Sequence, residues 1–241
     1  MKKIEILCDE IVQWLKEKVT NAGCKGVTVG LSGGIDSAVV AALAKKAFPN
    51  NTLGVIMPSH SNPEDEEHAR LLADSLNIET KKIDLTETFD TLLEELDDKG
   101  DNQLAVSNIK PRLRMTTLYY FAQKNKYLVA GTGNKSEFTI GYFTKFGDSG
   151  VDILPIVDLV KEEVRDLAKY LNVPEIIITK PPSAGLWENQ TDEDEMGITY
   201  KELDHYIKTG EAKDSIKNKI ENMKKASEHK RKLPKMFTVN R

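Results

Sequence analysis

Short apolar segments alternate with longer helical segments along the first half of the chain, and this alternation constrains the fold more than any other feature. The segments with strand character are residues 27–31, 52–57, 80–85 and 127–131. Helical segments of roughly ten or more residues separate them, as crossovers between parallel strands require. We therefore predict an α/β fold: a doubly wound parallel sheet of about five strands with helices on both faces. Ligands of such a sheet bind outside the carboxyl ends of its strands.

The helices are predicted from apolar residues spaced three or four apart and from start and stop signals. They cover residues 2–20, 36–48, 63–76, 86–96, 105–124, 158–171, 199–208 and 213–229. Asn62 is expected to cap the helix that begins at Pro63, and Pro111 is expected to break or kink its helix. The acidic run 192–195 is predicted to be a solvated loop that becomes ordered over the functional site.

Composition favours a single globular domain over residues 1–241, because 39% of the residues are apolar and 30% are charged. The 34 basic and 38 acidic side chains give a formal charge of −4, which disfavours a nucleic-acid partner bound through bulk positive charge. The longest wholly apolar run, residues 38–44, is too short to span a membrane, and the amino terminus has no signal-peptide core. We expect a cytoplasmic protein with no nucleic-acid or membrane partner.

The most informative motif lies where the first predicted strand meets its helix. Its residues are Gly30, Leu31, Ser32, Gly33, Gly34, Ile35, Asp36 and Ser37. A strand end, two glycines and a helix start turn several backbone N–H groups toward one point, and such a nest binds phosphate. The lysine of the Walker motif is absent. A carboxylate beside a polyphosphate repels it unless a cation bridges them, so Asp36 implies Mg²⁺. The alternative is a plain strand-to-helix turn with Asp36 as a first-turn charge.

This Ser-Gly-Gly-Ile-Asp-Ser motif resembles the pyrophosphatase loop of the N-type ATP pyrophosphatases, which split ATP between the α and β phosphates. Later segments distinguish among the members of that superfamily: residues 131–137, 141–152, 182–187 and 190–193, with Lys161 between them. In this order they resemble the ammonia-dependent NAD⁺ synthetases over nearly the whole chain. The resemblance implies an adenine nucleotide alpha hydrolase-like fold in a single synthetase domain.

The resemblance also implies roles for individual residues. Asp36 and Glu137 would hold Mg²⁺, and together with Lys161 they would be the catalytic groups. ATP would be bound by the glycine loop at residues 30–37 and by Thr132, Lys161 and Ser183. Deamido-NAD⁺ would be bound by Arg112, Lys145, Asp152, His229 and Lys230.

The residues by themselves leave other roles open for some of these side chains. Glu137 could be a solvated helix charge, and His229 and Lys230 could be a basic helix end. Arg112 and Arg114 point to different helix faces, so one could serve a phosphate and the other a structural ion pair.

The reaction that the resemblance implies has two steps. The nicotinate carboxylate of deamido-NAD⁺ attacks the α-phosphorus of ATP and displaces pyrophosphate; ammonia then displaces AMP from the acyl-adenylate and gives NAD⁺. Glutamine-using relatives carry an additional amidase domain, which we do not expect here. The family forms homodimers, and the apolar segment 115–122 is suitable interface material.

Two other functions use the same loop. A tRNA-thiolating enzyme would need a reactive cysteine near the site, and the only cysteines, Cys8 and Cys24, precede the first strand. A non-catalytic adenine-nucleotide-binding module could dispense with the two metal carboxylates. Both cysteines are expected to be inert packing residues, because no C-x-x-C spacing or histidine partner indicates a disulfide framework or a zinc site.

Overall fold

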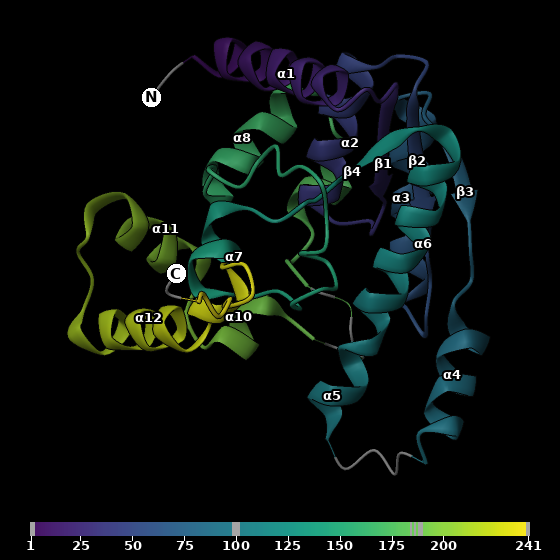
Figure 1. Cartoon of the computed structure of the whole chain (residues 1–241). Coiled ribbons are helices and arrows are strands. Elements are labelled where there is room, and N and C mark those ends of the chain that lie inside the picture. Colours follow the sequence, from purple (N-terminus) through teal and green to yellow (C-terminus); the bar gives the residue numbers. More distant parts are fainter. Residues whose placement is uncertain (1–2, 98–101, 184, 186, 188–189, 240–241) are drawn as a thin grey trace.

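The computed structural model describes residues 3–97, 102–183, 185, 187 and 190–239. Its centre is a parallel sheet with the strand order β3–β2–β1–β4 (Figure 1). The strands are β1 (Gly26–Gly30), β2 (Thr52–Ile56), β3 (Glu79–Lys82) and β4 (Tyr127–Ala130). Val29 in β1 pairs with Gly54 on one side and with Ala130 on the other. The order reverses between β1 and β4, which makes this the topological switch point where ligands of such sheets bind.

A single parallel bridge from Ala130 to Ile153 lies where a fifth strand would extend the sheet. The described residues therefore form four strands, where the sequence predicts about five. Pro155 follows two residues after the bridge and has no N–H to donate to a ladder, so pairing ends there.

Helices cover both faces of the sheet, as the alternation predicts (Figure 1). On one face α1 (Ile4–Asn21), α2 (Ile35–Ala47), α3 (Pro63–Ser75) and α8 (Lys161–Tyr170) contribute side chains to the main hydrophobic core. On the other face α6 (Ile109–Asn125) packs on β1 and β4, and Leu118 and Phe121 complete a second apolar cluster. The other helices are α4 (Thr86–Glu95), α5 (Gln103–Ser107), α7 (Lys135–Ile140), α9 (Glu175–Thr179), α10 (Asp192–Met196), α11 (Tyr200–Thr209), α12 (Asp214–Ala226) and the 3₁₀ turn Glu228–Lys230.

A smaller apolar cluster lies beside the sheet, where α7, α10, α11 and α12 pack together (Figure 1). Ile140 of α7, Leu203 of α11 and Ile220 of α12 are almost completely buried in it. This cluster holds the C-terminal helices against α7, which follows β4 in the chain.

Several predicted segments have other bounds in the structure, including the strand 80–85, which ends at Lys82, and the helix 158–171, which begins at Lys161. The break expected near Pro111 is confirmed. The helix over 105–124 is interrupted at Asn108, before Pro111, which becomes the third residue of α6. A missing N–H has no partner to lose at that position, whereas a continuous helix would bring the Pro111 ring against the carbonyl of Ser107. The run 192–195 forms most of α10, and α12 ends at Ala226, earlier than expected. No described helix combines the length and hydropathy needed to cross a membrane.

Candidate active site

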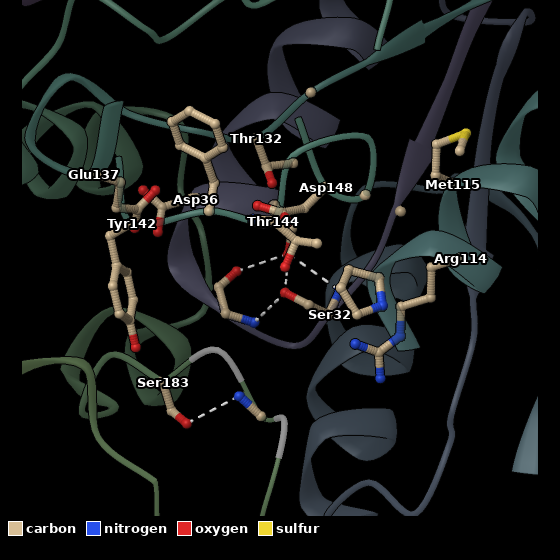
Figure 2. A pocket seen from close by; sticks show the side chains of 18 of the residues that line it. Ser32, Asp36, Arg114, Met115, Thr132, Glu137, Tyr142, Thr144, Asp148 and Ser183 are labelled. Carbon is tan, nitrogen blue, oxygen red and sulfur yellow. Dashed lines mark hydrogen bonds between the residues drawn. The ribbon is translucent and has the colours of Figure 1, made fainter. Parts of the chain in front are cut away.

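A cavity of about 700 Å³ opens at the carboxyl edge of the sheet (Figure 2). The last residues of three strands line it: Gly30 of β1, Ile56 of β2 and Ala130 of β4. It therefore lies at the switch point between β1 and β4, where the fold alone predicts a ligand.

The loop between β1 and α2 is held by its own hydroxyl groups. The Ser37 hydroxyl donates to the Gly34 carbonyl at 2.9 Å and lies 3.0 Å from Ser32 Oγ, and Gly34 N donates to Ser32 Oγ at 3.3 Å. Gly33 has φ +77°, and a Cβ there would lie 2.3 Å from the carbonyl oxygen of Asp65. No side chain caps α2 at Gly34, so its first N–H groups are available to an anion at the cavity wall.

Three charged side chains meet beside this loop. The Lys161 ammonium is 2.5 Å from Asp36 Oδ2 and 3.3 Å from Glu137 Oε1, and the lysine side chain is only 2% exposed. Asn134 Nδ2 donates to Asp36 Oδ1 at 2.8 Å. Figure 2 shows the two carboxylates next to each other at one side of the cavity. The sequence-predicted catalytic residues are thus brought together.

Each member of this cluster stands in the first turn of a helix. Asp36 is the second residue of α2, Glu137 the third of α7, and Lys161 the first of α8. Glu137 is also fixed by a capping box, since its N–H donates to Asn134 Oδ1 at 3.0 Å and its carboxylate accepts from Asn134 N at 3.3 Å. First-turn carboxylates are favoured by the helix dipole.

A third acid, Asp192, lies behind Glu137. The Tyr200 hydroxyl is 2.8 Å from Asp192 Oδ2 and 3.2 Å from Glu137 Oε1, and both Tyr200 and Asp192 are buried. Asp192 Oδ1 is buried without a hydrogen-bond partner in the described structure. The prediction of a solvated loop at 192–195 is therefore wrong for Asp192. The acidic run was the available signal, but the burial of its first member depends on the packing of α10 against α11.

Burial governs the protonation of this cluster. Desolvation raises the pKa of Glu137 to about 7. The negative charges of Asp36 and Asp192 also raise it, whereas the positive charge of Lys161 lowers it. Desolvation also raises the pKa of Asp192. For Lys161, burial would lower the pKa, but the charges of Asp36 and Glu137 outweigh it and raise it. Three acids therefore face one lysine, so the site has a deficit of positive charge.

That charge balance and the orphaned Asp192 oxygen are what a divalent cation would satisfy, and carboxylate oxygen is the ligand that Mg²⁺ prefers. Within the described ranges no three His, Cys, Asp or Glu side chains form a ready metal cage. Asp36 and Glu137 are therefore a fitting pair of carboxylates that could hold Mg²⁺, and the charge of Asp192 nearby would add to the attraction for a cation.

Four of the five residues expected to bind the dinucleotide lie around another part of the same cavity. Lys145 Nζ donates to the His229 carbonyl at 2.9 Å, and Arg112 Nη2 donates to the Lys145 carbonyl at 3.3 Å. Lys230 Nζ donates to two backbone carbonyls, those of Gly141 at 2.9 Å and Phe143 at 2.8 Å. The C-terminal residues are therefore anchored to the loop after α7.

Two of the predicted site residues do not line the cavity. The Asp152 carboxylate accepts hydrogen bonds from Val129 N at 2.8 Å and from the Tyr119 hydroxyl at 3.0 Å, which ties the chain after the loop to β4. Gly33 shapes the phosphate loop without facing the cavity. The remaining predicted residues line it: Gly30, Leu31, Ser32, Gly34, Ile35, Asp36, Ser37, Arg112, Thr132, Glu137, Lys145, Lys161, Ser183, His229 and Lys230.

Arg114 is a half-buried cation of the cavity wall (Figure 2). Its guanidinium donates to the Met57 carbonyl at 3.1 Å and to Ser61 Oγ at 3.2 Å, and no described carboxylate lies within ion-pair distance. Burial lowers the pKa of Arg114, and Asp65 and Asp148 partly restore it. The sequence left open which of Arg112 and Arg114 would form a structural ion pair; Arg114 instead bonds to the end of β2 and the following loop.

Comparisons with known proteins show which family the chain belongs to. A profile of the NAD synthase family matches residues 7–234. The chain is 54% identical over 231 residues to an NH3-dependent NAD⁺ synthetase of Carboxydothermus hydrogenoformans, covering 95% of each chain. It is 53% identical over 238 residues to an NH3-dependent NAD⁺ synthetase of Finegoldia magna, covering 98% of this chain and 97% of the relative.

A solved structure described as the NMN synthetase of Francisella tularensis superposes with a TM-score of 0.95 at 40% identity, covering 99% of this chain and 100% of the other. Both the sequence likeness and the likeness in structure extend over almost the whole chain. The chain therefore belongs to the NAD synthase family.

Proposed function

We propose that the chain is an ammonia-dependent NAD⁺ synthetase, a ligase that forms the amide bond of NAD⁺ from deamido-NAD⁺ and ammonia at the expense of ATP. The observation that carries the proposal is the meeting of a phosphate nest with Asp36, Glu137 and Lys161 at the switch point. Relatives more than half identical over nearly their full length bear the same name.

ATP is the co-substrate in this proposal. The uncapped start of α2 and the loop at residues 30–37 would bind its phosphates, and Thr132 and Ser183, which also line the cavity, would contact the same nucleotide. Asp36 and Glu137 would hold Mg²⁺, which would neutralise phosphate charge as a Lewis acid.

The first step joins the nicotinate carboxylate to the α-phosphorus of ATP while the bond to the β-phosphate oxygen breaks. The nucleophile and ATP are both anions, so the protein must bring them together against repulsion. Lys161 would stabilise the charge that the departing pyrophosphate gains, and the α2 N–H groups would act on the same anion.

In the second step ammonia attacks the acyl carbon, the bond to AMP breaks, and the nitrogen loses a proton to form the amide. AMP is a far better leaving group than the oxide of a free carboxylate. Arg112, Lys145, His229, Lys230 and Asp152 would hold the dinucleotide. Because Asp152 is directed toward β4 and Tyr119, its contact with substrate requires a rearrangement or a second subunit.

The cellular setting and assembly also belong to the proposal: a cytoplasmic homodimer that binds neither nucleic acid nor membranes. Of the apolar segment 115–122, Leu118 and Phe121 pack inside the chain, whereas Tyr120 is 61% exposed and would lie at the interface. Sedimentation of the 27.0 kDa chain as a species of twice that mass would support the dimer.

The mononucleotide is a second candidate substrate, because the structure that superposes with a TM-score of 0.95 is described as an NMN synthetase. Nicotinate mononucleotide has the same reacting carboxylate but lacks the adenylate half. The deciding experiment measures pyrophosphate and amide formation with deamido-NAD⁺ and with nicotinate mononucleotide, each with ATP, Mg²⁺ and ammonium.

A higher kcat/KM for deamido-NAD⁺ than for nicotinate mononucleotide supports the proposal. A higher kcat/KM for the mononucleotide would instead make the chain an NMN synthetase. Pyrophosphate release triggered by tRNA would indicate a thiolating enzyme. Tight ATP binding without turnover on any of these substrates would indicate a binding module.

A further inference from the structure

A buried carboxylate on α11 joins the two helix starts that carry Glu137 and Lys161. We propose that Asp204, acting through Ser136, is a positioning residue that sets the spacing between Glu137 and Lys161. Asp204 is 4% exposed, and Ser136 is fully buried. Asp204 does not line the cavity, so it acts through its neighbours.

Both oxygens of this carboxylate are used, one for each helix. Asp204 Oδ1 accepts from the Ser136 hydroxyl at 2.5 Å, and Asp204 Oδ2 accepts from Glu162 N at 2.9 Å. Ser136 Oγ in turn accepts from Lys161 N at 3.2 Å. Ser136 directly precedes Glu137, and Glu162 directly follows Lys161, so the bridge lies one residue away from each charged group.

A second residue on the same face of α11, Tyr200, also contacts the charged cluster of Asp36, Glu137 and Lys161. Tyr200 and Asp204 are four residues apart and both buried, so they lie on one side of the helix. Tyr200 contacts the Glu137 side chain, whereas Asp204 contacts the backbone of α8 and the residue before Glu137. Helix α11 therefore orients Glu137 at both its carboxylate and its chain position.

Packing alone gives no reason for an acid at position 204. Leu203 of the same helix is already fully buried in the apolar cluster, and a buried carboxylate is unfavourable unless both oxygens find donors. The start of α8 has a separate bond, from Val160 N to Glu163 Oε2 at 3.0 Å. What Asp204 adds is a second link between α7 and α8, beside the direct bond from Lys161 N to Ser136 Oγ, and with it a tighter constraint on two side chains 24 residues apart.

This inference rests on the proposed function, since it assigns Asp204 a role in placing that reaction's charged groups. Residues that orient metal ligands typically change metal affinity or activity about 10–100-fold when replaced. We expect Asp204→Asn to lower kcat and weaken Mn²⁺ binding in the presence of ATP by such a factor. The binding of ATP without metal should change less than about threefold.

The experiment compares Asp204→Asn, Ser136→Ala and the control Glu163→Ala in the full chain. The control removes the other bond at the start of α8 without touching α7. Mn²⁺ binding is measured by electron paramagnetic resonance, turnover by pyrophosphate release, and folding by thermal denaturation. All turnover measurements are made well below the lowest melting temperature.

Loss of kcat and of Mn²⁺ affinity in Asp204→Asn and Ser136→Ala, with Glu163→Ala unchanged in both, supports the inference. Because the two residues form one bridge, their double variant should lose little more than the worse single one. Wild-type kcat and Mn²⁺ affinity in a folded Asp204→Asn overturn it, as does an equal loss in Glu163→Ala.

If Asp204→Asn does not fold, Ser136→Ala decides by the same criteria. A wild-type protein that releases no pyrophosphate refutes the proposed function, while the Mn²⁺ comparison still tests the positioning role.

Discussion

Lys161 is the residue on which the charge balance of the site depends. Its ammonium contacts Asp36 and Glu137 and lies 4.7 Å from the Tyr200 ring centroid, so the buried lysine is enclosed by anions and an aromatic face. One cation among Asp36, Glu137 and Asp192 stabilises the fold only in part. An arriving divalent ion would complete the neutralisation.

Replacing Asp36 should lower the rate of catalysis with little effect on the stability of the fold. We expect Asp36→Asn to lower pyrophosphate release by about a hundredfold or more, because one charge of the metal and phosphate site is lost. The amide oxygen can still accept from Asn134, and Lys161 keeps Glu137, so the melting temperature should change little. Asp9→Asn, at an exposed position of α1, is the matched control. Near-normal rates at saturating Mg²⁺ would contradict the role of Asp36.

Glu137 makes stability depend on pH in an unusual direction. Its pKa is about 7 in the folded chain against 4.5 for the free group, so between these values only the folded state holds the proton. Unfolding then releases a proton, and the free energy of unfolding falls as pH rises through this window, by at most about 3 kcal/mol.

The glutamine side chain in Glu137→Gln does not titrate, so the free energy of unfolding of this variant should lack the fall with pH that Glu137 causes. Denaturant unfolding in EDTA should therefore show the variant gaining stability relative to the wild type between pH 5 and pH 8. Acids that do not interact with Glu137 act equally in both proteins and cancel. A constant difference across this range would contradict the raised pKa of Glu137.

At the scale of elements, the turn between β1 and α2 has room only for glycine at position 33. A Cβ at Gly33 would meet backbone atoms of Asp65, at 2.3 Å from its oxygen and 2.9 Å from its Cα, and φ is +77°. To make room, either the start of α3 or the glycine loop that leads to the uncapped start of α2 would have to shift.

We expect Gly33→Ala to weaken ATP binding at least tenfold and to lower the melting temperature. Gly23→Ala is the matched control, since Gly23 has φ +68° but nothing within 4 Å of its Cβ. That control should show only the left-handed strain of roughly 1–2 kcal/mol, with ATP affinity intact. Calorimetric titration with ATP gives both affinities. Equal affinities for Gly33→Ala and wild type would refute the steric argument.

At the scale of the whole molecule, neither cysteine is placed to release ammonia from glutamine. Cys8 is buried in α1, where desolvation raises the pKa of its thiol, and Cys24 lies before β1; neither lines the cavity. We expect NAD⁺ formation with ammonium and none with glutamine, and full activity in Cys24→Ser. Turnover with glutamine that disappears in Cys24→Ser would contradict this expectation.

Much of the fold could be predicted because its signals are local. The alternation of strands and helices, the Asn62 cap with Pro63, and the glycine turn all act within a few residues, and the structure confirms each of them. The number of strands and the ends of helices could not be predicted as well, because each depends on a single proline. Pro155 ends the pairing of a fifth strand, and Pro111 interrupts a continuous helix.

The glycine loop and the placement of Asp36 near Glu137 follow from the sequence, since parallel strands bring their carboxyl ends to one edge. Only tertiary packing buries Asp192, turns Asp152 toward β4, and places Asp204 under the starts of two helices. The positions of Asp192 and Asp204 depend on how α10 and α11 pack around a small apolar cluster, and that of Asp152 depends on β4 and α6. Contacts between segments far apart in the chain have no period or spacing in the sequence that could reveal them.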